Sequence, residues 1–243
     1  MLVHQNNIKN NRFDVIENIY TPLEVPNIIS VINKADQSNS AFRKTDELFA
    51  IRRFLIEVPE VKNLIFTQKL KSIIYDLFGE GYFVVKSIYF DKPEKSNWFV
   101  AWHQDLTIAV NGKTELTSYG PWTVKLNNFG VQPPVNILQK NFTIRIHLDD
   151  TDKNNGALKV LKGSHLKDVY RVENIDWQAE NEEICDVKAG GIMIMRPLLM
   201  HASDRSTINQ RRRVIHIEFS NANLPTEIDW AEKELIENID QCA

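Results

Sequence analysis

The chain has 243 residues, 43% of them hydrophobic, which is enough to bury a full core in a single domain spanning residues 1–243. Its net charge of −3 gives no overall basic surface, so we expect no nucleic-acid partner. No run of about 18 apolar residues predicts a membrane span, and the polar N-terminus lacks the pattern of a signal peptide. Because Cys185 and Cys242 are too few for a disulfide framework, we expect a cytoplasmic protein.

An N-terminal part, residues 13–79, is expected to be mainly helical. Thr21, Pro22 and Glu24 are typical of a helix start, with a capping threonine, a proline at the first helical position and a capping-box glutamate at the third. They predict a helix over residues 22–36. Its buried stripe would comprise Leu23, Ile28, Ile29 and Ile32.

Two further patterns lie in this part of the chain. Residues 61–78 carry apolar side chains at helical spacing and stop at Gly79, which predicts one or two helices with a buried face. Residues 50–55 are apolar and basic at once. That segment is either a strand or turn with solvated arginines, or a segment that points Arg52 or Arg53 into a pocket.

The apolar pattern changes to period two at Tyr82, and residues 80–220 are expected to form a β-rich core. Residues 82–90 and 98–105 are the first strand candidates. Residues 106–140 then form a long connection with scattered Gly, Pro and Asn. Connections of that length inside a compact domain are usually functional, so we expect a lid or binding loop there.

Residues 142–148 alternate apolar and polar side chains, which predicts another strand. The apolar face should pack on helices or on an opposite sheet. The polar face carries Thr143, Arg145 and His147. It therefore either meets water or lines the interior of a barrel.

The C-terminal part predicts three more features. Residues 184–187 and 192–195 flank the pair Gly190-Gly191 and indicate a hairpin. A last strand over residues 212–219 would return beside that hairpin. Residues 226–240 would form a terminal helix. Together the elements suit a mainly β fold with flanking helices, a double-stranded β-helix (a jelly roll, or cupin-like barrel).

His103, Asp105 and His201 are the candidate metal ligands. His103 and Asp105 lie two positions apart and would share one side of an extended strand. His201 is far away in the sequence, but a jelly roll brings distant strands together at one mouth. Two histidines and one carboxylate form the facial triad that holds a non-haem Fe(II) and leaves coordination positions open for cosubstrate and O2.

Arg212, eleven residues after His201, is the candidate anchor for a cosubstrate. A fixed guanidinium there could fork onto the far carboxylate of a dicarboxylate. Arg212 belongs to the basic run Arg211-Arg212-Arg213, of which only alternate members can face the interior from a strand. We therefore expect Arg211 and Arg213 to point outward.

At these positions the sequence resembles the phytanoyl-CoA dioxygenase family of Fe(II)/2-oxoglutarate oxygenases. The resemblance is carried by the His103-Gln104-Asp105 pair of ligands, by the segment 155–165 with its Asn-Gly start, and by the segment 196–203 around His201. It covers roughly residues 80 to 220. The family fold is a double-stranded β-helix, which supports the predicted architecture by analogy.

The resemblance implies an Fe(II) ion on the three candidate ligands, chelated by the cosubstrate 2-oxoglutarate. The far carboxylate of 2-oxoglutarate would pair with Arg212, helped by the hydroxyl of Ser203. In the family the strand at 142–148 crosses the active site, so Arg145 would hold an anionic group of substrate or cosubstrate. Consumption of O2 would release succinate and CO2. Because Asp105 is present, the expected outcome is hydroxylation or desaturation of the substrate rather than halogenation.

The remaining candidates are substrate contacts: Trp102, Trp122, Thr143, His147 and, with them, Lys125. This lining would be aromatic and tolerant of anions, which suits a small polar metabolite better than a CoA thioester.

Two other classes of function stay open. One is a non-catalytic metal-binding jelly roll that binds a ligand, although such a protein has no need of a dicarboxylate clamp at Arg212. The other is a zinc-dependent hydrolase, since two histidines and an aspartate also suit zinc. No HExxH motif supports that hypothesis. The sequence carries no signal for an oligomeric state.

Overall fold

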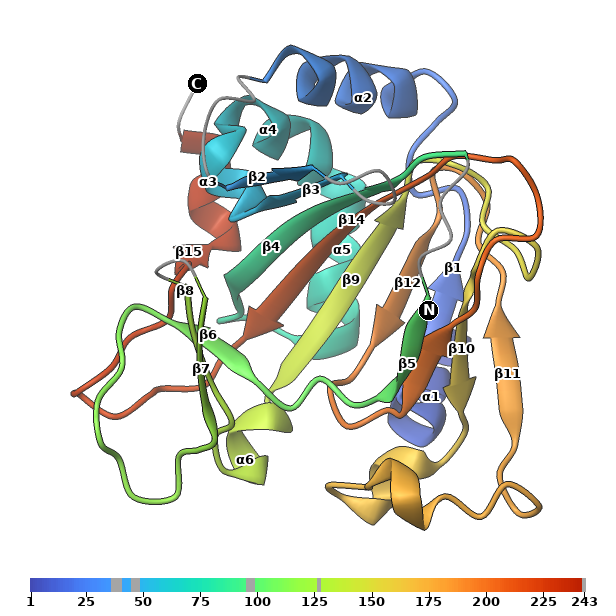
Figure 1. Cartoon of the computed structure of the whole chain (residues 1–243). Helices are drawn as coiled ribbons and strands as arrows, with labels where there is room; N and C mark the ends of the chain where they lie inside the picture. Colours follow the sequence, from blue (N-terminus) through green and yellow to red (C-terminus); the bar gives the residue numbers. More distant parts are fainter. Residues whose placement is uncertain (36–40, 45–48, 95–98, 126–127, 242–243) are drawn as a thin grey trace.

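The structure is a computed structural model that describes residues 1–35, 41–44, 49–94, 99–125 and 128–241. Cys242 and the start of the strand predicted at 98–105 lie outside the described residues. The chain folds into two facing antiparallel sheets, with helices against one of them and a third, small sheet at one end (Figure 1).

The large sheet has the strand order β1-β12-β9-β14-β4-β3-β2, and β15 also pairs with β4. The small sheet has the order β11-β10-β13-β5. Consecutive strands cross between the sheets, which makes the predicted jelly roll and confirms the expected fold. The large-sheet strands are β1 (Phe13–Ile16), β2 (Phe42–Lys44), β3 (Phe49–Arg52), β4 (Phe83–Lys92), β9 (Asn141–His147), β12 (Ile192–Met195), β14 (Arg212–Ser220) and β15 (Glu234–Leu235). The small-sheet strands are β5 (Val100–His103), β10 (Leu158–Leu161), β11 (Glu182–Cys185) and β13 (His201–Ser203).

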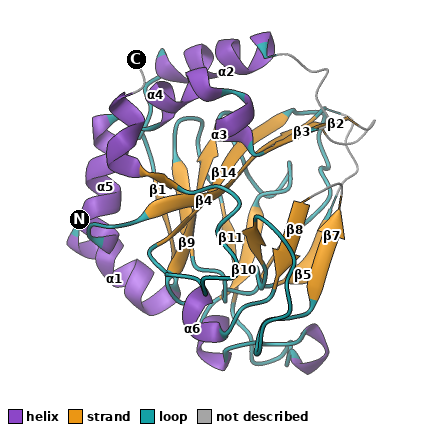
Figure 2. Cartoon of the chain, turned by 90° about the vertical axis from the view of Figure 1, so that its left-hand side faces the viewer, coloured by secondary structure: helices purple, strands orange, loops and turns teal. Residues whose placement is uncertain are grey.

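Helices cover the outer face of the large sheet (Figure 2). Strand β9 shows why, because Phe142, Ile144 and Ile146 join the helical side chains in one buried cluster, while Arg145 faces the small sheet. The predicted polar face of this strand therefore lines the interior. The helical elements here are α1 (Leu2–Asn11), α2 (Glu24–Lys34), α3 (Phe54–Glu57), η1 (Pro59–Val61), α4 (Lys62–Ile65) and α5 (Gln68–Phe78).

The capping box predicted for α2 is present. The backbone N–H of Thr21 donates to Glu24 Oε2 at 2.7 Å, and the Glu24 N–H donates to Thr21 Oγ1 at 3.3 Å. Ile28 and Ile32 are buried as expected, but Leu23 is 80% exposed because the helix proper begins only at Glu24. The helices predicted over 61–78 are α4 and α5, and α5 ends at Gly79, which has φ 84°.

Residues 106–140 are not an irregular lid. They contain the three-stranded sheet β6-β8-β7 and the short helix α6. Their bounds are β6 (Ile108–Val110), β7 (Trp122–Lys125), β8 (Asn128–Val131) and α6 (Val135–Leu138). This third sheet has its own apolar cluster with Phe83 and Trp230, so it packs against the end of the jelly roll.

Three local predictions are wrong. The segments around Gly190-Gly191 do not form a hairpin, since β11 pairs with β10 in the small sheet and β12 pairs with β1 and β9 in the large one. Strand β14 accordingly lies between β4 and β9 rather than beside that hairpin. The tail over 226–240 holds β15 and the 3-10 helix η4 (Ile236–Gln241) in place of an α-helix. The other 3-10 helices are η2 (Ser164–Lys167) and η3 (Val172–Asn174).

Among the described residues, no helix is both long and apolar enough to cross a membrane.

Candidate metal centre and its cavity

A cavity of about 250 Å³ opens between the two sheets, and its lining comes from both. From the large sheet it takes side chains of β4, β9 and β14, and from the small sheet side chains of β5, β10 and β13. The polar groups on its wall are Lys86, Lys92, His103, Asp105, Arg145, His201, Ser203, Arg212 and His216.

His103 and His201 face each other across neighbouring strands. They are directly opposed in the register of β5 and β13, and their ring centroids lie 4.2 Å apart. Each Nδ1 lies against a backbone carbonyl oxygen, that of Ala101 at 2.8 Å and that of Leu199 at 2.9 Å. Nδ1 therefore carries the proton, and the Nε2 lone pair of each ring is left to bind a metal.

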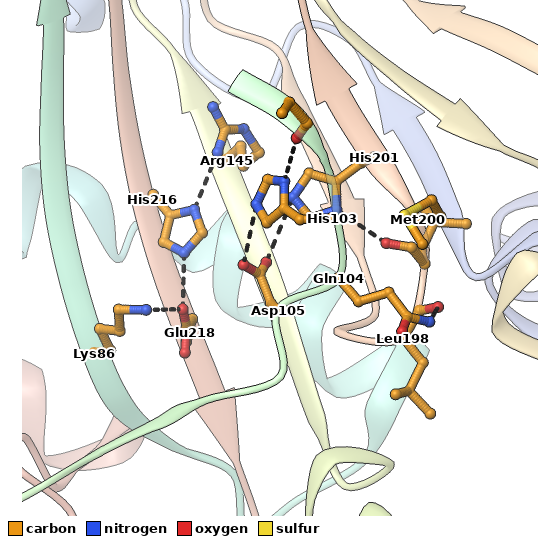
Figure 3. A network of polar contacts seen from close by, with 12 residues as sticks. Lys86, His103, Gln104, Asp105, Arg145, Leu198, Met200, His201, His216 and Glu218 are labelled. Atoms are coloured by element: carbon orange, nitrogen blue, oxygen red, sulfur yellow. Dashed lines mark hydrogen bonds and ion pairs between the residues drawn. The ribbon is translucent and has the colours of Figure 1, made fainter. Parts of the chain in front are cut away.

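Asp105 completes the group, although not from the strand itself. Strand β5 ends at His103, and the bend that follows turns Asp105 toward the two histidines. The backbone N–H of Asp105 donates to the Pro197 carbonyl oxygen at 3.0 Å. Its carboxylate oxygens lie 3.9 Å from His103 Nε2 and 3.8 Å from His201 Nε2 (Figure 3). These separations are too long for hydrogen bonds and leave room for an ion between the three groups, whose ligand atoms all lie within 4.8 Å of one another.

Electrostatics keep this donor set ready for a cation. Burial alone would raise the pKa of Asp105, but charge on the neighbouring His201, His216 and Lys86 holds it well below its usual range. Of these three groups, Lys86 is the one that is still charged near pH 7. Burial lowers the pKa of His201 to about 4, so its ring is neutral near pH 7. Asp105 Oδ2 is buried and accepts no hydrogen bond from the described residues. One carboxylate and two neutral imidazoles fit a divalent metal ion.

Gln104 fixes the bend between the two ligands. Its side-chain amide donates to the carbonyls of Leu198 at 2.6 Å and Asp168 at 2.8 Å, and its oxygen accepts from the N–H of Tyr170 at 2.8 Å. Three backbone partners thus hold a side chain that is only 7% exposed. The sequence pattern had singled out only the residues on either side of it.

Arg212 enters the same cavity from the first position of β14. Its neighbours point the other way, since Arg211 pairs with Asp91 and Arg213 with Asp149, each through two hydrogen bonds. This is the alternation that the basic run predicted. Burial and the nearby Arg145 lower the pKa of Arg212 to about 9. Both effects disfavour the charged guanidinium, and a bound anion would offset them.

The partners of Arg212 leave part of its donor capacity unused. Its Nη1 donates to the carbonyl oxygen of Gly156. Gly156 has φ +82°, and a Cβ there would lie 2.7 Å from the Asp204 carbonyl oxygen, so only glycine fits. Arg212 Nε and Ser203 Oγ are buried with no hydrogen-bond partner among the described residues. These orphaned groups fit an acidic cosubstrate bound beside the metal ligands.

A buried chain of polar contacts runs along the opposite wall (Figure 3). Arg145 Nη1 donates to His216 Nδ1 at 3.1 Å, and His216 Nε2 lies 3.0 Å from Glu218 Oε1. Because an arginine can only donate, His216 Nδ1 must accept, and the ring proton sits on Nε2 facing Glu218. Glu218 in turn accepts from Lys86 Nζ at 2.6 Å. The chain holds Arg145 in place with a neutral imidazole.

Four of the candidate substrate contacts, Trp102, Trp122, Thr143 and His147, are not among the residues that line this cavity. Trp102 packs against Trp177, with their ring centroids 5.7 Å apart, and Trp122 packs with the third sheet. Thr143 is buried within β9, and His147 Nδ1 lies 2.8 Å from Thr151 Oγ1. None of the four is part of the cavity wall described above.

The sequence alone did not identify three residues of this site: His216, Glu218 and Lys86. A signal was present, because period two places His216 on the same face as Arg212.

The chain is thus a jelly roll whose cavity brings together two histidines and one carboxylate as a candidate metal centre. The chain belongs to the phytanoyl-CoA dioxygenase family, whose model matches residues 16–214. This confirms the resemblance noted in the sequence and, with it, the expected class of iron- and 2-oxoglutarate-dependent oxygenases. No curated protein matches the sequence.

Solved structures share the fold at low sequence identity. HygX from Streptomyces hygroscopicus, with nickel, 2-oxoglutarate and hygromycin B bound, is 12% identical with a TM-score of 0.66, and the match covers 98% of this chain and 99% of that one. EctD from S. alaskensis with bound Fe is 15% identical with a TM-score of 0.69, covering 90% and 76%. The carbocyclase SnoK from nogalamycin biosynthesis is 15% identical with a TM-score of 0.67, covering 92% and 85%.

Proposed function

We propose that this chain is an Fe(II)- and 2-oxoglutarate-dependent dioxygenase that hydroxylates or desaturates a small-molecule substrate. One observation carries the proposal. Two histidine Nε2 atoms and one carboxylate converge in the same cavity as Arg212, a buried arginine whose Nε has no partner among the described residues. A protein that only bound a metal would have no use for that arginine, and no HExxH motif supports a zinc hydrolase.

His103, Asp105 and His201 would hold the iron as a facial triad. Iron, once bound, would activate O2, which is the oxidant, and 2-oxoglutarate would be the co-reductant that is converted to succinate and CO2. The contribution of the protein would be to hold the three metal ligands in position. The carbonyls behind each Nδ1 fix the two imidazole rings, and Gln104 fixes the bend that presents Asp105.

The arginines would orient the cosubstrate. Arg212 pairs with the far carboxylate of 2-oxoglutarate through its free Nε, and the Ser203 hydroxyl donates to the same group. Arg145, held by His216, is placed for a second anionic group near the metal ligands. Arg212 is buried, and Arg145 is half-buried with its Nε shielded from solvent, so the anion would meet them in a poorly solvated site where charge attraction is strong.

The test is anaerobic addition of Fe(II) and 2-oxoglutarate to metal-free protein. Chelation of the metal by 2-oxoglutarate gives a weak visible charge-transfer band, which reports cosubstrate binding without any substrate. We expect the band in the wild-type protein and an apparent 2-oxoglutarate affinity at least about tenfold weaker in Arg212→Ala, since a charge-assisted pair is lost. Arg211→Ala is the matched control, because its side chain points away to Asp91.

Two results would contradict the proposal. One is a folded, iron-loaded protein that shows no band, which would favour a ligand-binding jelly roll. The other is stoichiometric zinc without 2-oxoglutarate binding, which would favour the hydrolase.

A further inference from the structure

A second and larger cavity, of about 550 Å³, lies between the β3–β4 end of the large sheet and the third sheet, β6-β8-β7. Its size is within the range of about 300–1,000 Å³ that encloses small organic ligands. The metal cavity, at about 250 Å³, is below that range. Once the metal and cosubstrate occupy the smaller cavity, the larger one is the space left for another molecule.

The two cavities are neighbours. Lys86 and Ile88, both on β4, line each of them. Thr107, two residues after the metal-ligand candidate Asp105, also lines the larger cavity. A molecule that fills the larger cavity can therefore extend toward the metal ligands alongside Lys86 and Ile88.

The wall of the larger cavity is cationic. Arg52, Arg53, Lys86 and Lys125 line it, and Glu232 is the single carboxylate among its lining residues. That carboxylate is engaged, because it accepts from the N–H and the hydroxyl of Ser87 at 2.9 and 2.5 Å.

The four cations differ in how far they are already engaged. Lys86 pairs with Glu218, and Arg53 interacts electrostatically with Glu232. Arg52 and Lys125 have no side-chain hydrogen bond or ion pair with any residue in the part of the chain that the structure describes. They are the two cations available to a ligand.

Strand geometry places these cations on opposite sides of the space. Arg52 is paired with Ile88 in the β3–β4 register, and cross-strand partners share a face of the sheet. Lys125 lies two positions after Thr123 on β7, so both point from the third sheet into the cavity. Between them, Ile108 and Phe129 supply apolar surface.

We infer that this cavity is the substrate site, and that the substrate is an organic anion whose carboxylate or phosphate group is held by Arg52 and Lys125. Its carbon skeleton packs against Ile108 and Phe129 and reaches the metal cavity past Lys86. The inference rests on the proposed function only in naming the ligand a substrate. Binding of the anion itself is a property of the cavity and can be measured without iron.

The experiment uses the full chain, freed of metal, with phenyl phosphate and benzoate as probes and benzyl alcohol as their uncharged counterpart. Affinities are measured by calorimetry or ligand-observed NMR. We expect at least one of the anions to bind more tightly than benzyl alcohol and to bind at least about fivefold more weakly to Arg52→Gln and to Lys125→Gln, as befits partly solvated charge pairs. Lys9→Gln, on the exposed side of α1, is the control and should bind as the wild type does.

The two anions separate the possible groups, because preference for phenyl phosphate indicates a phosphorylated substrate and preference for benzoate a carboxylic acid. Equal binding of benzyl alcohol would overturn the inference. So would loss of anion binding in Arg212→Ala with no loss in Arg52→Gln and Lys125→Gln, since the anion would then lie in the cosubstrate site. Lys125 is exposed on an edge strand, so its variant reports even where Arg52→Gln folds poorly.

This outcome is separable from that of the proposed function. The charge-transfer band without anion binding would sink this inference alone, and anion binding without the band would sink the proposed function alone.

Discussion

His103 and His201 are held by the same local arrangement on two different strands. In each case Nδ1 faces the carbonyl oxygen of the residue two positions earlier, Ala101 or Leu199. The orientation of both rings is thus set by backbone, which no side-chain substitution removes. Asp105 has no comparable support for its carboxylate, because Oδ2 accepts nothing among the described residues. The carboxylate is the ligand whose position depends most on the metal.

Asp105→Ala is expected to abolish succinate release linked to substrate, because the remaining pair of histidines cannot hold the metal in the facial arrangement. Asp204→Ala is the matched control. Asp204 lies three residues after the metal-ligand candidate His201 in the sequence, but its carboxylate is 67% exposed and pairs with Lys159. Metal content and succinate formation are measured on both variants. Full turnover by Asp105→Ala would refute the ligand assignment.

At this scale the sequence predicted the converging ligands and the inward position of Arg212, because both depend only on spacing and alternation. The prediction that Thr143 and His147 also contact the substrate needed more information than the alternation of a strand provides. They lie on the same face of β9 as Arg145, as predicted, but the cavity wall includes only Arg145 of the three. How far a cavity extends along a strand depends on what the opposite sheet places over it, and a sequence does not show that.

At the scale of elements, strands β4 and β14 carry the charged chain that supports Arg145. Lys86 and Glu218 are cross-strand partners in the antiparallel register, and they form an ion pair whose side chains are 26% and 8% exposed. Burial alone would lower the pKa of Lys86, but Glu218 and Asp105 raise it, so the lysine stays charged. The pair therefore couples the two strands and keeps His216 supplied with an acceptor.

Removing one partner should cost more than removing both. Glu218→Ala leaves Lys86 and His216 without their acceptor, and we expect a loss of roughly 2–3 kcal/mol in unfolding free energy, below the 3–5 kcal/mol of a fully buried pair because Lys86 keeps some contact with water. The double variant Lys86→Met/Glu218→Leu should recover most of that loss. Urea unfolding curves measure both. Equal destabilisation of the single and double variants would show that the pair contributes through packing alone.

The element that the sequence misassigned most clearly is the segment around Gly190. Two apolar runs flanking a Gly-Gly pair are typical of a hairpin, yet β11 and β12 belong to different sheets. Gly190 has φ +83°, and a Cβ there would lie 2.4 Å from the Tyr20 carbonyl oxygen, so the glycine serves a close approach to the N-terminal segment. The local signal for a turn was correct. The partner of each strand is a long-range property.

The whole molecule is built so that the site exists only when both sheets are in place. The metal ligands come from the small sheet and the loop after β5, whereas Arg145 and Arg212 come from the large sheet. Spacing along the chain could propose such a meeting, but the crossing of strands between two layers is what produces it. The packing of the two sheets against each other also buries titratable groups away from solvent.

Four histidines share this burial. Burial lowers the pKa of His201 and of His165 to about 4, that of His147 well below its ordinary value, and that of His216 as well. Each is neutral in the folded chain and takes up a proton near pH 6.5 once unfolded. Because the unfolded state then binds more protons than the folded one, unfolding free energy rises with pH in this window and is lost as pH falls.

We therefore expect the metal-free protein to lose stability steadily from pH 7 to pH 5. Each histidine protonated only in the unfolded state contributes about 1.4 kcal/mol per pH unit to the slope once the pH is below its unfolded pKa. His147 tests the cause, since it lies outside the proposed metal ligands and its Nε2 has no partner among the described residues. His147→Gln should lower the slope between pH 6 and 5 by roughly one proton's worth, whatever it does to stability at pH 7. Chemical unfolding at a series of pH values gives the slope directly. If stability stays flat or increases on acidification, the buried rings are not neutral in the folded state, and the electrostatic account of the cavity fails with them.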